Sequence, residues 1–229
     1  MPLLSLVMKT NSLVALLALS LVGVAAADTF TVVNADDSGP GSLRIAITDA
    51  NAHPNIDLDV PDVIAFAIPG AGVHTITPIS VYPSITDPVV IDGYTQGSAS
   101  ENSLAVGNNA VLLIELNGAN VGGAAIGLDL AGGRSTVRGL VINRFGASAF
   151  AFAGSGGVRM ASDNNIVAGN FFGSNPTGDA ALANVGFSAT VDAGIDNMIG
   201  GTTPADRNLF ASSAIDRGRA AGSDPRSLR

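Results

Sequence analysis

The feature that most constrains the fold of this chain is a loose internal repeat of about 30 residues, which runs from Ala125 to Leu209. Two series of apolar positions carry it: Leu128, Val158 and Ala189, and Val137, Ile166 and Met198. The steps are 30 and 31 residues in the first series and 29 and 32 in the second. Short β-forming runs that return at this spacing, without helical patterns between them, predict a chain that coils on itself as a solenoid.

The composition supports many short strands and tight turns. Apolar residues make up 47% of the chain but aromatic residues only 5%, and there are 28 glycines. The core is therefore expected to consist of small aliphatic side chains. The chain has no cysteine, so no disulfide stabilises the fold.

The first 27 residues have the pattern of a secretory signal peptide. Lys9 provides the positive charge, a mostly apolar stretch runs from Leu13 to Val24, and Ala25 to Ala27 fit a cleavage site. The mature chain is predicted to begin at Asp28 and to be secreted or held at the cell surface. An uncleaved anchor helix is the alternative, although the apolar stretch is short for one. No second segment of membrane length is present in the sequence.

The charge of the mature chain limits its partners. Removing Lys9 from the 11 Lys and Arg residues leaves 10 arginines against 19 acids, a net charge of −9. This field disfavours nucleic acid and anionic lipid.

Three segments are predicted: a signal peptide over 1–27, a repeat domain over 28–214 and a disordered or aberrant tail over 215–229. The tail is either native or the mark of a truncated or frame-altered chain. Within the domain, a helix is predicted near 42–52, with Ser42 as its N-cap and with Leu43, Ala46, Ile47 and Ala50 on one face. Such a helix would cover the open first coil.

Strands are predicted at six further places: Thr29 to Asn34, Val63 to Ile68, His74 to Thr77, Val89 to Ile91, Val111 to Leu116 and the repeat itself. A loop is predicted from Gly173 to Asn184.

Several motifs resemble a family of bacterial secreted parallel β-helix repeat proteins. The stretch from Asp37 to Ile47 is similar to an N-terminal motif that commonly reads Cys-Ser-Leu-Arg-Glu-Ala-Ile. Further matches lie at 85–96, 114–118, 135–145, 175–178 and 199–204. The resemblance covers about Thr29 to Leu209 and implies an all-β, right-handed parallel β-helix of pectate-lyase-like (pectin lyase-like) shape. Gly41 and Ile45 depart from the motif's Cys and Glu.

Asparagines recur near the predicted strand ends: Asn143, Asn165, Asn170, Asn184, Asn197 and Asn208. Stacked coils can align such amides in ladders that satisfy buried backbone groups, and Asn at a corner can adopt the left-handed conformation. A structural role is favoured over a ligand site.

The candidate catalytic residues are three acids on successive predicted strands, Asp92, Glu115 and Asp129, and one base, Arg138. Neighbouring strands in a sheet lie about 4.8 Å apart, so two acids on one face could form a glycosidase pair. A lyase would need an arginine as base, because the mature chain has no lysine. Arg144 and Arg159 are the other candidates for that base.

Asp57, Asp59 and Asp62 form a short acidic cluster. Oxygen-rich clusters can bind Ca²⁺, but the spacing lacks the glycine and distal glutamate of a twelve-residue calcium loop. A solvated turn is the favoured interpretation, with Ca²⁺ as the alternative; no other cofactor is expected.

The sequence thus predicts a secreted or cell-surface parallel β-helix protein with a structural, adhesive or glycan-binding role and extracellular polysaccharides or surface components as partners. Two alternatives remain. One is a polysaccharide lyase or glycoside hydrolase that acts on extracellular glycans. The other is a truncated fragment of a longer β-helix protein, which an exposed apolar end on the last coil would favour. The sequence leaves the oligomeric state open.

Overall fold

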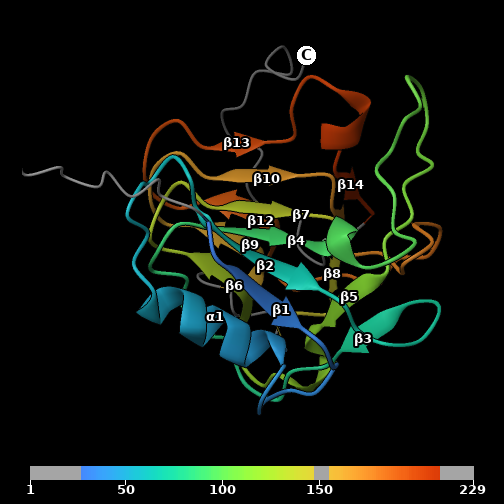
Figure 1. Ribbon diagram of the computed structural model, residues 1–229. Coiled ribbons are helices and arrows are strands. Elements are labelled where there is room, and N and C mark those ends of the chain that lie inside the picture. The colour runs from blue at the N-terminus through green and yellow to red at the C-terminus, as the bar shows by residue number, and fades with distance from the viewer. Residues whose placement is uncertain (1–26, 147–154, 212–229) are drawn as a thin grey trace, which may run out of the picture.

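The computed structural model describes residues 27–146 and 155–211, which form three parallel β-sheets beside one α-helix (Figure 1). The six-stranded sheet contains β1 (Thr29–Val32), β2 (Asp62–Phe66), β4 (Val89–Asp92), β7 (Thr136–Arg138), β10 (Ile166–Ala168) and β13 (Met198–Ile199). The five-stranded sheet contains β14 (Leu209–Phe210), β11 (Phe171–Phe172), β8 (Leu140–Asn143), β5 (Ile114–Asn117) and β3 (His74–Ile76). The three-stranded sheet contains β12 (Phe187–Val191), β9 (Gly156–Met160) and β6 (Ile126–Leu130).

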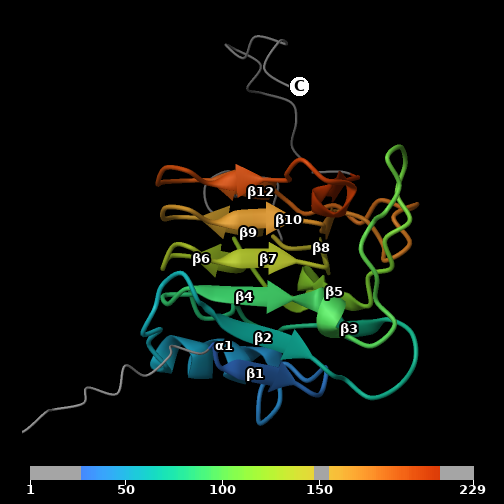
Figure 2. The same cartoon turned by 45° about the horizontal axis from the view of Figure 1, so that its top comes forward.

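From β6 onward the chain visits the three sheets in a fixed order, and this order is the physical basis of the repeat. In the three-stranded sheet, Leu128 pairs with Val158 and Val158 with Ala189, which confirms the first series of predicted positions. The second series is wrong by one residue at its first step, because Val137 pairs with Val167 rather than Ile166. Strands in each sheet therefore lie one above another along a common stack (Figure 2).

The prediction of a closed right-handed parallel β-helix is wrong: the described residues form three parallel sheets of unequal size, and no closed solenoid is found. The third sheet begins only at β6. Before that strand, a single bridge between Ile85 and Leu130 stands in its place. The repeat recognised in the sequence therefore governs only the second half of the stack, and the first half has two sheets.

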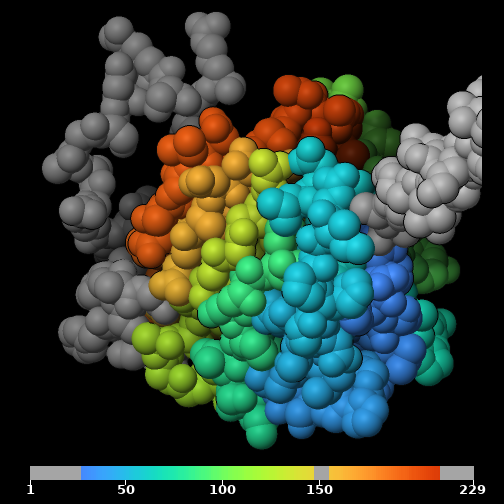
Figure 3. Space-filling view, turned by 60° about the vertical axis from the view of Figure 1, so that its left-hand side comes forward, coloured from blue at the N-terminus to red at the C-terminus, as the bar shows by residue number. Residues whose placement is uncertain are grey.

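Helix α1 (Leu43–Ala52) lies beside β1 and β2 at the beginning of the stack, where the apolar spacing predicted a helix (Figures 1 and 3). The Ser42 side chain caps it by accepting a hydrogen bond from the Ile45 N–H at 3.4 Å. Arg44 fastens the helix to two loops, because it pairs with Asp37 at 2.8 Å and donates to the Val81 carbonyl at 2.7 Å. The space-filling view shows successive stretches of chain as adjoining bands that start from this end.

Four of the six asparagines form two amide ladders that run along the stack. In the first, the Ser135 N–H donates to Asn165 Oδ1 at 3.1 Å, and the Asn165 N–H donates to Asn197 Oδ1 at 2.9 Å. In the second, the Leu140 N–H donates to Asn170 Oδ1 at 3.1 Å, and the Asn170 N–H donates to Asn208 Oδ1 at 2.9 Å. The predicted ladders are therefore confirmed.

The left-handed conformation falls one residue earlier than the sequence suggested. None of the six asparagines has a positive φ. Instead, Arg134, Asn164 and Asp196 have φ of 52°, 60° and 56°. Each directly precedes a ladder position, so the left-handed residue turns the chain and places the following amide in line.

The last strand of each sheet, β12, β13 and β14, has one edge without a strand partner among the described residues. We call this surface the β12–β14 end. Large apolar side chains are exposed there: Phe187, Val191, Ile195, Met198, Ile199 and Phe210. This is the apolar end that the fragment alternative predicts.

Two predicted segments, the signal peptide over 1–27 and the tail over 215–229, lie outside the described residues except for Ala27. Within the described ranges, no helix is long and apolar enough to cross a membrane. The short 3-10 helices η1 (Gly93–Thr95), η2 (Gly118–Asn120) and η3 (Pro204–Asp206) come after β4, β5 and β13.

Candidate functional site

Asp92 and Arg138, two of the candidate catalytic residues, are neighbours in the six-stranded sheet. They occupy paired positions at the ends of β4 and β7, and their side chains form an ion pair of 2.7 Å. Glu101 binds the other end of the guanidinium at 3.0 Å. The Arg138 guanidinium also lies 5.9 Å from the centre of the Tyr94 ring. Two carboxylates therefore hold this arginine against an aromatic face.

These contacts determine the protonation of the cluster. Burial acts to lower the pKa of Arg138, but the hydrogen bond and charge of Asp92, together with Glu101, hold the pKa above its ordinary value. Burial also raises the pKa of Tyr94 to about 12, and its hydroxyl donates to the Gly169 carbonyl at 2.7 Å. Arg138 is consequently held as a cation, which opposes a role as general base.

Glu115 is buried in the five-stranded sheet, away from Asp92. It accepts hydrogen bonds from the Thr75 hydroxyl at 2.6 Å and from Asn143 Nδ2 at 2.7 Å. Both partners lie on the adjacent strands, β3 and β8. The carboxylate thus joins three strands and satisfies their polar side chains.

Asp129 lies in the third sheet and forms a two-bond ion pair with Arg159 on β9, at 2.8 and 3.0 Å. The Ser84 hydroxyl donates to the same carboxylate at 2.6 Å. Burial alone would raise the pKa of Asp129, but the hydrogen bonds from Arg159 and Ser84 and the Arg159 charge hold it below its ordinary value. The three candidate acids therefore lie on three different sheets, and the structure does not bring them into one catalytic pair.

The acidic cluster at 57–62 is also divided among partners. Asp57 accepts from the Asp59 N–H at 2.9 Å, Asp59 pairs with Arg134, and Asp62 pairs with His53 at 2.9 Å. Within the described part of the chain, no three His, Cys, Asp or Glu side chains are arranged to hold a metal ion. The Ca²⁺ alternative stays a prediction, and Arg144, with a φ of 59°, lies at a turn after β8.

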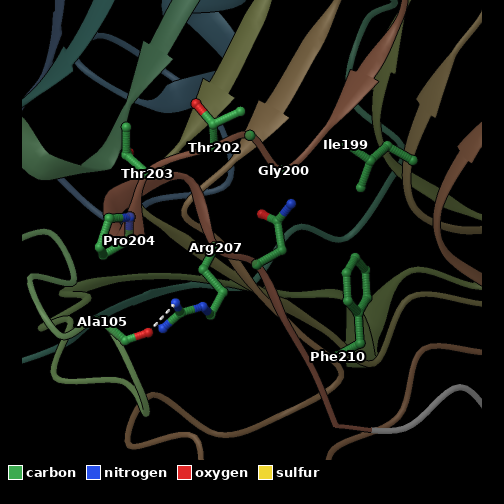
Figure 4. A pocket seen from close by; sticks show the side chains of 10 residues that line it. Ala105, Ile199, Gly200, Thr202, Thr203, Pro204, Arg207 and Phe210 are labelled. Carbon is green, nitrogen blue, oxygen red and sulfur yellow. Dashed lines mark hydrogen bonds between the residues drawn. The ribbon is translucent and has the colours of Figure 1, made fainter. Parts of the chain in front are cut away.

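A pocket of about 550 Å³ opens at the β12–β14 end, and we call it the β13–β14 pocket (Figure 4). Its lining residues are Ala105, Ile199, Gly200, Gly201, Thr202, Thr203, Pro204, Arg207, Asn208 and Phe210. This volume falls in the range of about 300–1,000 Å³ that is typical of small-ligand sites. The Phe210 ring, 52% exposed, forms one wall and stacks on the buried Phe172 with 5.2 Å between ring centres.

One side of the pocket is fixed by a loop, residues 97–111, which rises along the stack (Figure 2). Arg207 donates to the carbonyls of Ala105 at 3.1 Å and Leu104 at 3.3 Å, and Asn102 Nδ2 donates to the Pro204 carbonyl at 2.9 Å. Because the Arg207 guanidinium is used in these bonds, its role here is to hold the loop in place.

The second amide ladder ends in this pocket. At the two earlier positions of that ladder, the backbone N–H of Leu140 or Asn170 donates to an asparagine amide oxygen. The equivalent N–H of Asn208 has no hydrogen-bond partner among residues 27–146 and 155–211. The pocket therefore contains a backbone donor at a position that elsewhere in the stack binds an amide oxygen.

Sequence reasoning missed this pocket, because it interpreted every member of the asparagine series as structural, the last one included. The signal was Asn208 beside Phe210, an amide next to an exposed aromatic at the final repeat. No protein-family model matches the chain, and no curated protein matches it.

Proposed function

We propose that the protein is an exported, non-catalytic adhesive protein that binds glycans bearing acetamido groups in the β13–β14 pocket. The observation that carries the proposal is the Asn208 N–H, which ends a ladder whose other members bind amide oxygens. An acetamido group presents the same kind of oxygen on a sugar. The apolar face of that sugar can lie against the exposed Phe210 ring.

The ion pairs of the sheets favour binding over catalysis. A lyase needs an arginine that can lose a proton, but the neighbouring carboxylates hold the pKa values of both Arg138 and Arg159 above the ordinary value. A glycosidase needs two carboxyl groups about 5–10 Å apart across a substrate. Asp92, Glu115 and Asp129 lie instead on β4, β5 and β6, one in each sheet.

Phe210→Ala is expected to weaken binding of chitotetraose, a tetramer of N-acetylglucosamine, by about 10-fold or more, because the stacking face is lost. Isothermal titration measures the affinity, and cellotetraose, which lacks the acetamido group, should bind far more weakly to the wild type. Phe187→Ala is the matched control, since Phe187 is 49% exposed on another terminal strand and does not line the pocket. Equal affinities for the two sugars, or unchanged binding by Phe210→Ala, would overturn the proposal.

A second candidate is a segment of a longer repeat protein, whose next strands would cover the β12–β14 end. The exposed Phe187 and Val191 side chains and the open strand edges favour it. Such an end should associate with itself at high concentration. Sedimentation that stays monomeric at all concentrations, together with chitotetraose binding, would exclude this candidate.

A further inference from the structure

A buried carboxylate near the beginning of the stack has fewer cationic partners than its surroundings require. Asp62, at the first position of β2, is only 2% exposed. Its Oδ2 pairs with His53 Nδ1 at 2.9 Å, and its Oδ1 accepts the backbone N–H of Asp28 at 2.7 Å. A buried charge is stable only when it is paired and hydrogen-bonded.

Three carboxylates surround that single histidine. Asp28 lies 3.1 Å from His53 Nε2, and the charge of Asp87 also acts on His53. The hydrogen bond to Asp62, aided by the charges of Asp62, Asp28 and Asp87, raises the pKa of His53. Even with His53 protonated, the group as described carries two more negative than positive charges. No arginine pairs with Asp28, Asp62 or Asp87 in the described part of the chain.

We propose that proteolytic processing between Ala27 and Asp28 supplies the missing cation. A signal peptidase adds one water molecule across the peptide bond, so that Ala27 leaves with a carboxylate and Asp28 keeps an α-ammonium group. The Asp28 nitrogen already lies 2.7 Å from Asp62 Oδ1, so the new ammonium forms a charged hydrogen bond with the buried carboxylate. Processing thereby stabilises the pairing of β1 with β2.

The position of Asp28 in the sheet strengthens this assignment. Its carbonyl accepts the Val63 N–H at 2.8 Å, and Thr29 pairs with Val63 in the parallel register of β1 and β2. The α-nitrogen is therefore held on both sides, by its own carbonyl and by the β1 backbone. The ammonium would gain its ion pair without reordering the chain.

The test uses the fact that Lys9 is the sole lysine of the sequence. A chain processed at Asp28 has one primary amine, its α-amine, which an N-hydroxysuccinimide ester of acetate modifies selectively. Acetylation keeps the N–H donor and removes only the charge. The full chain is expressed with its N-terminal segment, the exported protein is collected, and mass spectrometry identifies its first residue.

We expect the exported protein to begin at Asp28 and acetylation to lower its thermal midpoint by about 4–8 °C at pH 6.5. Asp62→Asn should reduce that difference to about 1 °C or less. The ion pair raises the α-amine pKa above its ordinary value of about 7.7–8.0, so its contribution is complete below that value and is lost as the pH rises through the folded-state pKa. His53 titrates in both samples and does not produce the difference.

A different first residue would overturn the processing site, and a start at Asp28 with equal midpoints before and after acetylation would overturn the ion pair. The wild-type comparison needs no substitution, so it holds even where Asp62→Asn does not fold. Neither result depends on glycan binding, so the failure of this inference and the failure of the proposed function are separate.

Discussion

Replacing Gly93 by alanine is expected to lower the free energy of unfolding by about 3 kcal/mol or more. Gly93 comes directly after β4 and is buried against the turn between β7 and β8. An added Cβ would overlap the carbonyl oxygen of Gly139 and would lie 2.7 Å from its carbonyl carbon and 2.8 Å from Leu140 Cδ2. The obstacle is mostly backbone, so a side-chain rotation cannot relieve it. Thermal unfolding should show a midpoint lowered by about 6 °C or more.

Gly97→Ala provides the matched control four residues away. A Cβ at Gly97 meets no atom within 4 Å. This substitution should change the free energy of unfolding by about 0.5 kcal/mol or less. Equal midpoints for the two variants would show that β4 and the turn at Gly139 do not approach each other as described.

The second large effect is expected from Asn170→Ala, which we predict to cost about 3 kcal/mol or more. Asn170 is 0% exposed. Its Oδ1 accepts from the Leu140 N–H at 3.1 Å, and its Nδ2 donates to the carbonyls of Val137 at 2.8 Å and Ala168 at 3.1 Å. Alanine would leave three backbone groups without these partners, at about 1–3 kcal/mol for each that stays unsatisfied. Urea denaturation measures the loss.

Asn120→Ala serves as the comparison, since Asn120 is exposed at the end of η2. Its unfolding midpoint should match the wild type. An Asn170→Ala variant as stable as Asn120→Ala would mean that water replaces the amide and that the ladder does not support the stack.

The parts of the fold that obey local rules could be predicted from the sequence. The 30-residue step from Leu128 to Val158 placed β6 beside β9, and the apolar spacing after Ser42 located α1. Closure into one solenoid could not be predicted, because it depends on how the chain crosses between sheets before β6. There, two long connections replace the strands that a third sheet would need.

The candidate site was harder to predict, for a geometric reason. Asp92, Glu115 and Asp129 do occupy strands, but the side of the stack that each faces is set by the turns between those strands. Those turns assign the three acids to different sheets. The pocket was missed because it arises at the end of a stack, where the Asn208 N–H and the Phe210 ring are left exposed together. Periodicity describes what repeats, and this site lies where the repeat stops.

The most direct test of the central claim is to add chitotetraose to the exported protein and to follow two signals in the same sample. One is the backbone amide resonance of Asn208, and the other is the appearance of new reducing ends or unsaturated product. Binding without catalysis predicts a saturable shift of the Asn208 resonance, lost in Phe210→Ala, while the tetrasaccharide stays intact. Sugar cleavage that disappears in Arg138→Ala, with no shift at Asn208, would contradict the claim and identify the protein as an enzyme.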